Sequence, residues 1–143
     1  MKKILLTVIA ISIYLNANFT TNTNGVVTDT TTLLQWQDSY SDNKDFVKKA
    51  YWTEAIDYCE ELVLEGKDDW RLPNIKELQS LIDNTKLHFS VNRAFKRKKS
   101  NLYWSSTTYK KIYTNAWRVN FANGSTSKGR KKNNSFVRCV RAN

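Results

Sequence analysis

Two short basic runs are the groups in this sequence best suited to bind another molecule. The first is KRKK at positions 96–99 and the second is RKK at positions 130–132. Arginine binds sulfate or phosphate oxygens in a fork geometry, and lysine attracts them as a compact charge. We therefore predict a polyanion-binding surface made of Lys96, Arg97, Lys98, Lys99, Arg130, Lys131 and Lys132.

The distribution of charge along the chain supports this prediction. All 13 acidic residues lie between Asp29 and Asp83, whereas residues 84–143 contain 15 lysines and arginines and no acid. Solubility does not require such asymmetry, which favours an acidic partner. The alternative interpretation is that the basic half is a solvated surface that also neutralises the acidic half of the protein.

Residues that could catalyse a reaction are present but poorly arranged. The acid pairs EE at 60–61 and DD at 68–69 lie on or beside a predicted helix, where solvated charge is the simpler explanation. The serine pair at 105–106 has no evident histidine partner. No glycine-rich phosphate loop is present. We therefore expect a protein that is not an enzyme and that needs no cofactor.

The first 17 residues, MKKILLTVIAISIYLNA, have the pattern of a secretory signal peptide. Two lysines precede an apolar run from Ile4 to Leu15, and the small residue Ala17 follows. The run is too short to span a bilayer as a helix. We predict a signal peptide at 1–17, a flexible N-terminus at 18–25 and one domain at 26–143. The alternative is a retained N-terminal anchor. The exported chain would be periplasmic, cell-surface or secreted.

Export determines how the two cysteines, Cys59 and Cys139, are interpreted. In an oxidising compartment a widely separated pair is most simply one disulfide. A metal site needs three or four ligands, and the two cysteines with His88 offer too few. A cysteine nucleophile would also depend on His88, because the chain has no other histidine. We therefore predict a Cys59–Cys139 disulfide and no metal.

The first half of the domain reads as strands followed by helices. Residues 26–37 predict a strand, a turn and a second strand, with Asp29 accepting backbone hydrogen bonds in the turn. Residues 38–50 predict a polar loop. Apolar side chains recur at helical spacing from 52 to 65, so a helix is predicted there, with Gly66 ending it.

The stretch DWRLPNIKELQSLID at 69–83 predicts a second helix. Asn74 and Glu77 stand three residues apart, as in a capping box. Pro73 prevents a helix from continuing into this one from upstream. The conspicuous residues of this and related stretches therefore look structural: Trp36, Trp52, Trp70, Arg71, Leu72, Pro73, Glu77 and Trp104.

The second half of the domain reads as β-structure. Asn123-Gly124 is a strong hairpin signal, and residues 129–134 predict a basic turn. Strands are predicted at residues 102–107, 115–121, 125–128 and 135–141.

Six motifs, in this order, resemble the Lcl C-terminal domain family, the domain at the end of a collagen-like bacterial adhesin. They are Asp29 with TLLQWQ at 32–37, WTEAIDYC at 52–59, DWRLP at 69–73, KEL at 76–78, YWSST at 103–107 and VRCVR at 137–141. The resemblance covers about residues 26–141. One departure is Leu33, where the family usually has glycine. No Gly-x-y repeat precedes the domain, so stalk-driven trimerisation is not expected.

The resemblance implies a single α+β domain with two short helices packed on antiparallel strands. It also implies a fold related to the C-type-lectin-like and formylglycine-generating-enzyme-like folds. For the adhesin it implies attachment to sulfated glycosaminoglycans. No calcium motif of the lectin type, Glu-Pro-Asn or Trp-Asn-Asp, occurs in this chain.

Three functions are consistent with these features. The favoured one is an adhesin-like module that binds acidic polysaccharide, such as sulfated glycan or lipopolysaccharide. The second is an extracellular nucleic-acid binder, and the third is a structural envelope protein with no specific ligand. A nucleic-acid binder would stack bases on aromatic residues that lie among the basic ones. The candidates are Tyr103, Trp104, Tyr109, Tyr113 and Trp117.

Overall fold

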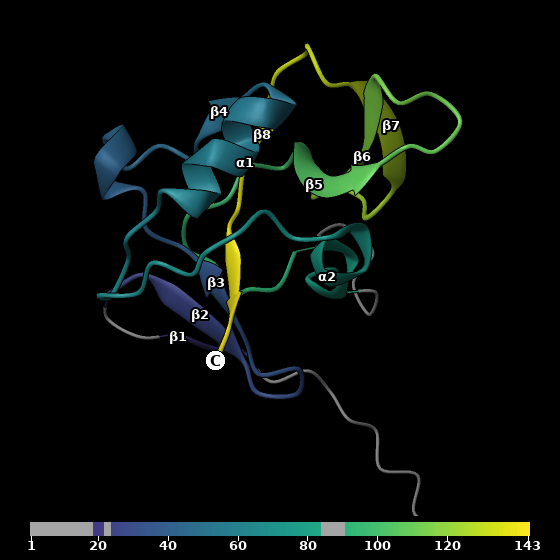
Figure 1. Cartoon of the computed structure of the whole chain (residues 1–143). Helices are drawn as coiled ribbons and strands as arrows, with labels where there is room; N and C mark the ends of the chain where they lie inside the picture. The colour runs from purple at the N-terminus through teal and green to yellow at the C-terminus, as the bar shows by residue number, and fades with distance from the viewer. Residues whose placement is uncertain (1–18, 22–23, 84–90) are drawn as a thin grey trace, which may run out of the picture.

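The structure is a computed structural model, which describes residues 19–21, 24–83 and 91–143 (Figure 1). It is a small α+β domain with two helices, as expected, and its strands form two sheets. The helices are α1 (Trp52–Glu60) and α2 (Ile75–Ser80), and a 3-10 turn, η1, spans Ser41–Asn43. The predicted signal peptide and His88 lie outside the described residues.

Each sheet is built from strands that are distant in sequence. The four-stranded sheet has the order β1 (Phe19–Thr21), β2 (Val26–Asp29), β3 (Leu34–Gln37), β9 (Val140–Ala142). The five-stranded sheet has the order β4 (Lys49–Ala50), β8 (Ser135–Phe136), β5 (Leu102–Thr108), β6 (Asn115–Asn120), β7 (Thr126–Arg130). All pairings are antiparallel except that of β5 with β8. The likeness to lectin-like folds stays a prediction.

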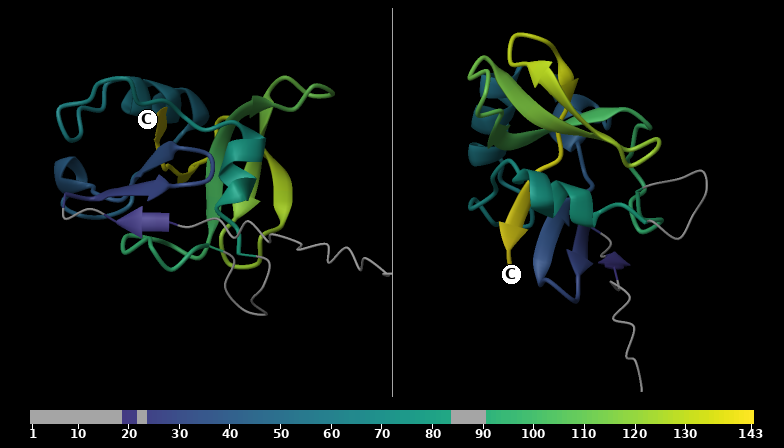
Figure 2. Two further views of the ribbon diagram at one scale, coloured as in Figure 1. Left: turned by 90° about the horizontal axis from the view of Figure 1, so that it is seen from below. Right: turned by 90° about the vertical axis from the view of Figure 1, so that its right-hand side faces the viewer.

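The predicted last strand at 135–141 is divided between the two sheets. β8 pairs with β4 and β5, the chain then crosses the interior, and β9 pairs with β3. Figure 2 shows this crossing from two further sides, with the C-terminal segment running from one sheet to the other. Its central residues, Val137, Arg138 and Cys139, are fully buried. An alternating pattern predicts extended backbone but not a change of partner strand.

The interior has two clusters of buried side chains, one on each side of β5. Neighbouring residues of a strand point to opposite faces, and Tyr103 and Trp104 accordingly belong to different clusters. The Tyr103 cluster includes Trp36 and Leu78, which come from the four-stranded sheet and α2. The Trp104 cluster includes Cys59, from α1. β5 therefore joins the two halves of the core.

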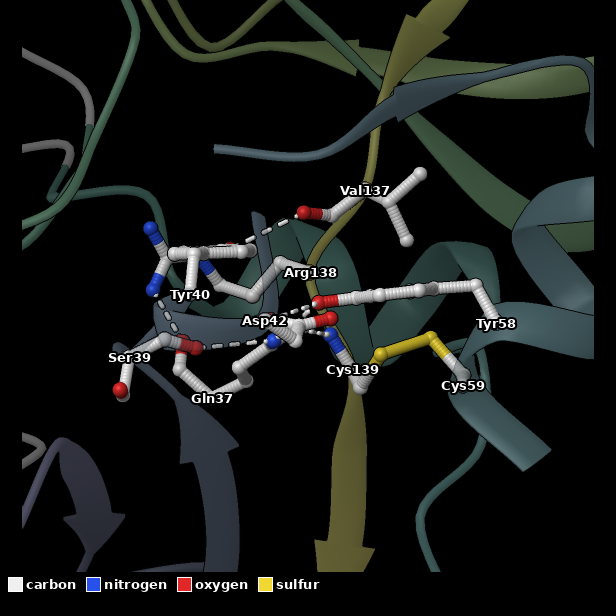
Figure 3. Close-up of a disulfide and its surroundings, with 9 residues drawn as sticks. All are labelled: Gln37, Ser39, Tyr40, Asp42, Tyr58, Cys59, Val137, Arg138 and Cys139. Atoms are coloured by element: carbon white, nitrogen blue, oxygen red, sulfur yellow. Dashed lines mark hydrogen bonds between the residues drawn. A yellow bond between two sulfur atoms is a disulfide. The ribbon is translucent and has the colours of Figure 1, made fainter. Parts of the chain in front are cut away.

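The predicted disulfide between Cys59 and Cys139 is present, with a Cα–Cα distance of 5.4 Å. It ties α1 to the segment that crosses between the sheets (Figure 3). Beside it, the Gln37 side-chain amide donates to the Tyr58 hydroxyl at 2.8 Å, and the Gln37 carbonyl accepts from Arg138. The crossing segment thus gains hydrogen bonds to Gln37 at Arg138 Nη1 and at the backbone N–H of Cys139. The buried Nε of Arg138 has no hydrogen-bond partner within the described residues.

The capping box at α2 is confirmed. The Asn74 side chain accepts from the backbone N–H of Glu77, and the Glu77 carboxylate accepts from the backbone N–H of Asn74, both at 2.9 Å. Arg71 adds a bidentate ion pair to the same carboxylate at 2.7 and 2.8 Å. The other residues interpreted as structural are buried or half-buried, namely Trp36, Trp52, Trp70, Leu72, Pro73 and Trp104. The WRLP motif therefore supports the fold.

The first helix is shorter than predicted, because α1 ends at Glu60 rather than near Glu65. Beyond it the chain makes a tight turn, in which Leu64 and Lys67 exchange two backbone hydrogen bonds. The central residues Glu65 and Gly66 both have positive φ, at 57° and 67°. Gly66 thus belongs to this turn and does not mark the helix end. Helical spacing alone did not reveal the turn, because Leu62 and Leu64 remain half-buried after the helix has ended.

Two other segments differ from the sequence expectations. Phe19–Thr21, expected to be loose, forms β1 and pairs with β2. The segment 38–50, expected to be a polar loop, carries the buried residues Asp38, Tyr40 and Val47 and ends in β4. At the predicted Asp29 turn, by contrast, the carboxylate accepts backbone N–H groups as expected. Local turn chemistry was visible in the sequence, whereas burial of this segment was not.

Candidate functional site

The structure places the two basic runs at opposite ends of the five-stranded sheet. Leu102, at the start of β5, pairs with Asn120, whereas Asn115, at the other end of β6, pairs with Arg130. Residues 96–99 precede β5, so they lie at the Asn120 end. Residues 130–132 lie at the Asn115 end. Five residue steps at about 3.3 Å each separate these ends by about 17 Å. The two runs therefore do not meet in one surface.

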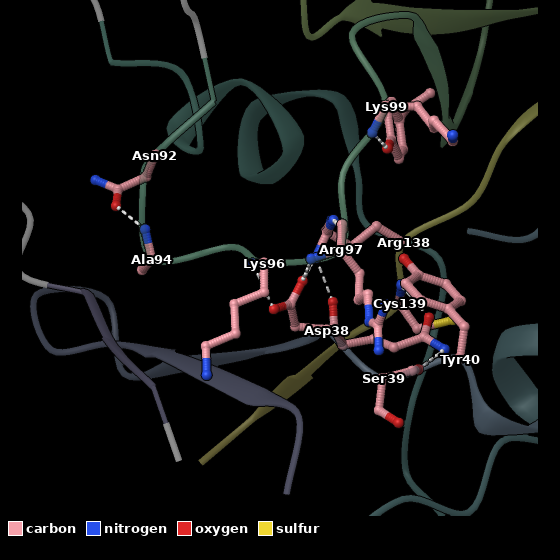
Figure 4. Close-up of polar contacts among 12 residues, drawn as sticks. Asp38, Ser39, Tyr40, Asn92, Ala94, Lys96, Arg97, Lys99, Arg138 and Cys139 are labelled. Atoms are coloured by element: carbon pink, nitrogen blue, oxygen red, sulfur yellow. Dashed lines mark hydrogen bonds and ion pairs between the residues drawn. The ribbon is translucent and has the colours of Figure 1, made fainter. Parts of the chain in front are cut away.

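The 96–99 loop has a fixed backbone (Figure 4). The buried carboxylate of Asp38 accepts from the backbone N–H of Lys96 at 2.7 Å and of Arg97 at 3.0 Å. Arg138 donates to the backbone carbonyl of Arg97. The backbone N–H of Lys99 donates to the hydroxyl of the buried Tyr103 at 2.8 Å. All four side chains of the loop are exposed.

Folding brings acids to this loop although the second half of the chain has none. Asp38 caps its backbone, and Asp45 forms an ion pair with the Arg97 guanidinium at 3.4 Å. These carboxylates also border a hollow of about 410 Å³ beside Lys96 and Arg97. Acidic residues from the first half of the chain therefore neutralise part of the positive charge at this end of the sheet.

The other end of the sheet gathers more basic residues than the sequence run alone. The backbone N–H of Lys131 donates to the Thr114 carbonyl at 2.8 Å, and the backbone N–H of Trp52 donates to the Lys131 carbonyl at 3.0 Å. The β7–β8 turn is thus tied both to the β5–β6 turn and to the start of α1. We call this region the basic end; its cations are Lys110, Lys111, Arg130, Lys131 and Lys132.

Lys131 is a structural member of the basic end. Its ammonium group lies 3.8 Å from the centroid of the Trp52 ring and donates to the Thr108 hydroxyl at 2.9 Å. Its side chain is half-buried, whereas Lys110, Lys111, Arg130 and Lys132 are exposed. These four side chains are the cations of this end that stand out into solvent.

Exposed apolar side chains accompany these cations. Tyr113 is 77% exposed, Ile112 48% and Tyr51 44%, and all three belong to the turns and helix start that form the basic end. The surface predicted from the sequence did not include Lys110, Lys111, Ile112 or Tyr51. The KK pair at 110–111 was an available signal, because only two residues separate it from the end of the predicted strand at 102–107.

Gly129 permits the close packing that holds β7 in place. A Cβ atom at this position would lie 2.3 Å from the guanidinium carbon of Arg118. That guanidinium lies over the Trp104 ring at 5.4 Å and donates to the Lys128 carbonyl at 3.2 Å. Arg118 is therefore occupied within the sheet, and it positions the strand that leads into Arg130.

Most aromatic residues considered for base stacking are not free to stack. Tyr103 and Trp104 are fully buried. Tyr109 and Trp117 are half-buried and pack edge to face, with ring centroids 5.2 Å apart. Only Tyr113 of the five presents most of its surface to solvent.

Two of the residues weighed for catalysis, Asp69 and Ser105, have structural partners. Asp69 forms an ion pair with Arg141 at 2.6 Å, and this hydrogen bond lowers the pKa of its carboxyl. The Ser105 hydroxyl donates to the Trp117 carbonyl at 2.7 Å. Among residues 19–21, 24–83 and 91–143, no group of three His, Cys, Asp or Glu could hold a metal ion. Within the same ranges, no helix is long and apolar enough to cross a membrane.

Comparison with known proteins agrees with the motifs in the sequence. No curated protein matches the chain. The family model described as the Lcl C-terminal domain matches residues 25–141, which is nearly the whole described structure and includes the disulfide, the capping box and the basic end. The chain therefore belongs to the Lcl C-terminal domain family.

Proposed function

We propose that this protein is an exported, non-catalytic binding module that recognises acidic polysaccharide in an adhesin-like role. The observation that carries the proposal is the basic end, where four exposed cations lie in the same turns as exposed apolar side chains or line hollows with them. The ligand class is a sulfated glycan or a lipopolysaccharide. Membership of the Lcl C-terminal domain family is consistent with a binding module.

The mixture of residue types supports an acidic sugar chain. Sulfate and phosphate groups accept bidentate hydrogen bonds from arginine and are attracted by lysine. Sugar rings also present apolar C–H faces, which an exposed tyrosine can cover while its hydroxyl remains in water. Tyr113 stands two residues from Lys111 in one turn, so a ring and its acidic substituent can be bound together.

The 96–99 loop forms a second, separate basic surface in this proposal. Its backbone is held by Asp38 and Tyr103, so its four exposed side chains project from a fixed frame. Asp45 neutralises part of its charge through Arg97. We therefore expect this loop to contribute less to affinity than the basic end does, and to bind a different part of a long chain.

The test compares two variants that remove the same charge. One changes Lys110, Arg130 and Lys132 to serine, and leaves the structural Lys131 in place. The control changes Lys44, Lys67 and Arg93 to serine, which are exposed residues outside the basic end. Binding to heparin, as the sulfated polysaccharide, is measured at several salt concentrations.

We expect the first variant to bind heparin at least about ten-fold more weakly than wild type. Its affinity should also depend less steeply on salt concentration, because fewer counterions are released. Exposed charges are screened over about 8 Å at physiological ionic strength, so distant lysines contribute little. The control variant should stay close to wild type. Equal affinities and equal salt slopes for the two variants would mean that the basic end is only a solvated surface.

Nucleic acid is the second candidate, and Tyr113 is the observation that favours it. An exposed tyrosine among lysines can stack on an unpaired base. Single-stranded DNA of the same charge as the heparin chain separates the two ligands. Tighter binding of DNA than of heparin at the same salt concentration, lost in Tyr113→Ala, would replace the polysaccharide proposal with this one. Absence of binding to either ligand would leave a structural envelope role.

A further inference from the structure

Two hollows at the basic end share one lining residue, Lys132. The first has a volume of about 440 Å³ and is lined by Tyr51, Thr53, Lys131 and Lys132. The second has a volume of about 420 Å³ and is lined by Ile112, Thr114, Asn115, Arg130 and Lys132. Hollows of about 300–1,000 Å³ are of the size that holds small ligands. A chain-like ligand lying across both would pass over Lys132.

The backbone at Lys132 is held by its neighbours. The backbone N–H of Asn133 donates to the Arg130 carbonyl at 2.9 Å, which makes Lys131 and Lys132 the central residues of a closed turn. Lys131 is fixed on both sides by backbone hydrogen bonds and packs its ammonium group against Trp52. Its neighbour Lys132 is exposed and borders both hollows. Lys131 thus anchors the turn, and Lys132 presents its side chain to solvent from it.

Each hollow combines an apolar side chain with polar groups. Tyr51, partly exposed, belongs to the first hollow together with the Thr53 hydroxyl. Ile112, also partly exposed, belongs to the second together with the Asn115 amide and the Arg130 guanidinium. An apolar surface beside hydroxyl, amide and guanidinium groups matches a sugar ring, which has a C–H face and a rim of hydroxyl groups.

We propose that these hollows are two adjoining sugar subsites, and that Lys132 binds an anionic group carried between two neighbouring rings. The inference rests on the proposed polysaccharide function and specifies how the ligand lies. The Tyr51 hollow accepts one ring and the Ile112 hollow accepts the next. The ligand is therefore a chain of sugar rings with an acidic substituent on at least every second ring.

This arrangement distinguishes a ring-bearing polyanion from a chain of charges alone. A flexible polyphosphate can contact Lys132 and Arg130 but has no apolar face to place against Tyr51 or Ile112. An unpaired base could stack on tyrosine, yet an aliphatic side chain such as Ile112 offers it no aromatic partner. One hollow presents an aromatic side chain and the other an aliphatic one, and this combination favours sugar rings over bases or phosphates as the ligand of both.

The test measures affinities of the full exported chain for three probes. These are a sulfated heparin disaccharide, a sulfated heparin tetrasaccharide and linear polyphosphate with the charge of the tetrasaccharide. The variants are Tyr51→Ala, Ile112→Ala and Lys132→Ser. Val63→Ala is the matched control, because Val63 is 68% exposed and lies beyond the other end of α1. Thermal unfolding of each variant verifies that it is folded.

The expected result is that Tyr51→Ala and Ile112→Ala each weaken tetrasaccharide binding about 3- to 10-fold, as loss of one ring contact does. Polyphosphate binding should be unchanged in these two variants. Lys132→Ser should weaken binding of both polyanions, and the disaccharide should bind more weakly than the tetrasaccharide to wild type. Val63→Ala should change none of these affinities.

The subsites and the proposed function fail in different ways. If Lys132→Ser weakens tetrasaccharide binding while Tyr51→Ala and Ile112→Ala leave it unchanged, the basic end binds polyanions but has no sugar subsites. If polyphosphate loses as much affinity as the tetrasaccharide in the two alanine variants, ring recognition is likewise excluded. If neither wild type nor any variant binds the tetrasaccharide, the polysaccharide function itself is wrong.

Discussion

The guanidinium of Arg138 donates to the carboxylate of Asp38 at 3.2 Å, and the two side chains are 0% and 4% exposed. The guanidinium also lies 4.3 Å from the centroid of the Phe95 ring. Burial alone would lower the pKa of Arg138, but electrostatic interactions with Tyr40, Tyr103 and Asp38 raise it above its ordinary value. Arg138 therefore stays charged inside the protein and requires its carboxylate partner.

Removal of Asp38 is expected to be strongly destabilising. Asp38→Ala leaves a buried guanidinium without its counter-ion, which costs about 3–5 kcal/mol of unfolding free energy. The same change deprives the backbone N–H groups of Lys96 and Arg97 of their acceptor. Urea unfolding measures the first effect, and faster amide hydrogen exchange at residues 96 and 97 measures the second.

Asp45→Asn is the control for this prediction, because Asp45 has a positive φ of 63°, which asparagine tolerates better than alanine. It removes the ion pair of Arg97 with Asp45, in which both side chains are about half exposed. Exposed ion pairs contribute about 0–1 kcal/mol to stability, so this variant should unfold at a urea concentration close to that of wild type. A loss of stability in Asp38→Ala no greater than that in Asp45→Asn would contradict the importance assigned to the buried pair.

The disulfide is expected to contribute substantially to stability. Removal of a native disulfide from a small domain costs about 2–5 kcal/mol, and the 80-residue separation of Cys59 and Cys139 places this one toward the upper part of that range. The double variant Cys59→Ser, Cys139→Ser should therefore unfold at a lower urea concentration. Mass measurement of the untreated exported protein should find no free thiol. Two free thiols in folded, exported protein would contradict the pairing.

Glu77 is expected to act on stability and not on ligand binding. Glu77→Ala removes the carboxylate that caps α2 and pairs with Arg71, and loss of a cap costs about 0.5–2 kcal/mol. Heparin affinity of the folded variant should equal that of wild type. Weaker heparin binding with an unchanged melting temperature would show that Glu77 belongs to a binding site.

The contribution of Glu77 should also depend on pH. Burial would raise its pKa, but hydrogen bonds from Arg71 and the Asn74 backbone outweigh it, so the folded-state pKa lies below the ordinary 4.5. The stabilisation is therefore fully present above about pH 4.5 and is lost as the pH falls through the lower folded-state value. The stability difference between wild type and Glu77→Gln should be constant near neutral pH and narrow in acid. A stability difference that grows in acid would mean that folding raises the pKa of Glu77 instead of lowering it.

Replacement of Leu33 by glycine is expected to stabilise the protein. The φ of Leu33 is 60°, and its side chain is 57% exposed, so it has left-handed backbone and little packing to lose. Left-handed backbone costs an ordinary residue about 1–2 kcal/mol, and the flexibility of glycine costs about 0.5–1 kcal/mol. Leu33→Gly should therefore stabilise the protein by about 0.5–1 kcal/mol in urea unfolding.

Thr31→Gly in the same turn provides the comparison. Thr31 is exposed and is not among the residues with positive φ in the described chain. Glycine there relieves no strain and should lower stability by about 0.5–1 kcal/mol. If both glycine variants change stability in the same direction, the backbone strain at Leu33 is not the cause.

Much of the local structure could be predicted from the sequence because the interacting groups are close in the chain. Asn74 and Glu77 cap α2 across three residues, and Asp29 binds Thr31 and Thr32 in its own turn. Such contacts depend on the backbone torsions of a few residues, which residue types strongly bias. The Cys59–Cys139 pair was also predictable, because the chain has only two cysteines.

The placement of the candidate site depended on which strands pair. Residues 96–99 and 130–132 look like one kind of group in the sequence, but the register of β5, β6 and β7 puts them at opposite ends of a sheet. The same register brings Lys131 to Thr114 and Trp52, and so places Lys110, Ile112 and Tyr51 at the basic end. The stretch 135–141 looks like one strand and is divided between two sheets. Composition therefore determined that the chain carries exposed positive charge, whereas long-range strand pairing decided where that charge is concentrated and which apolar side chains stand beside it.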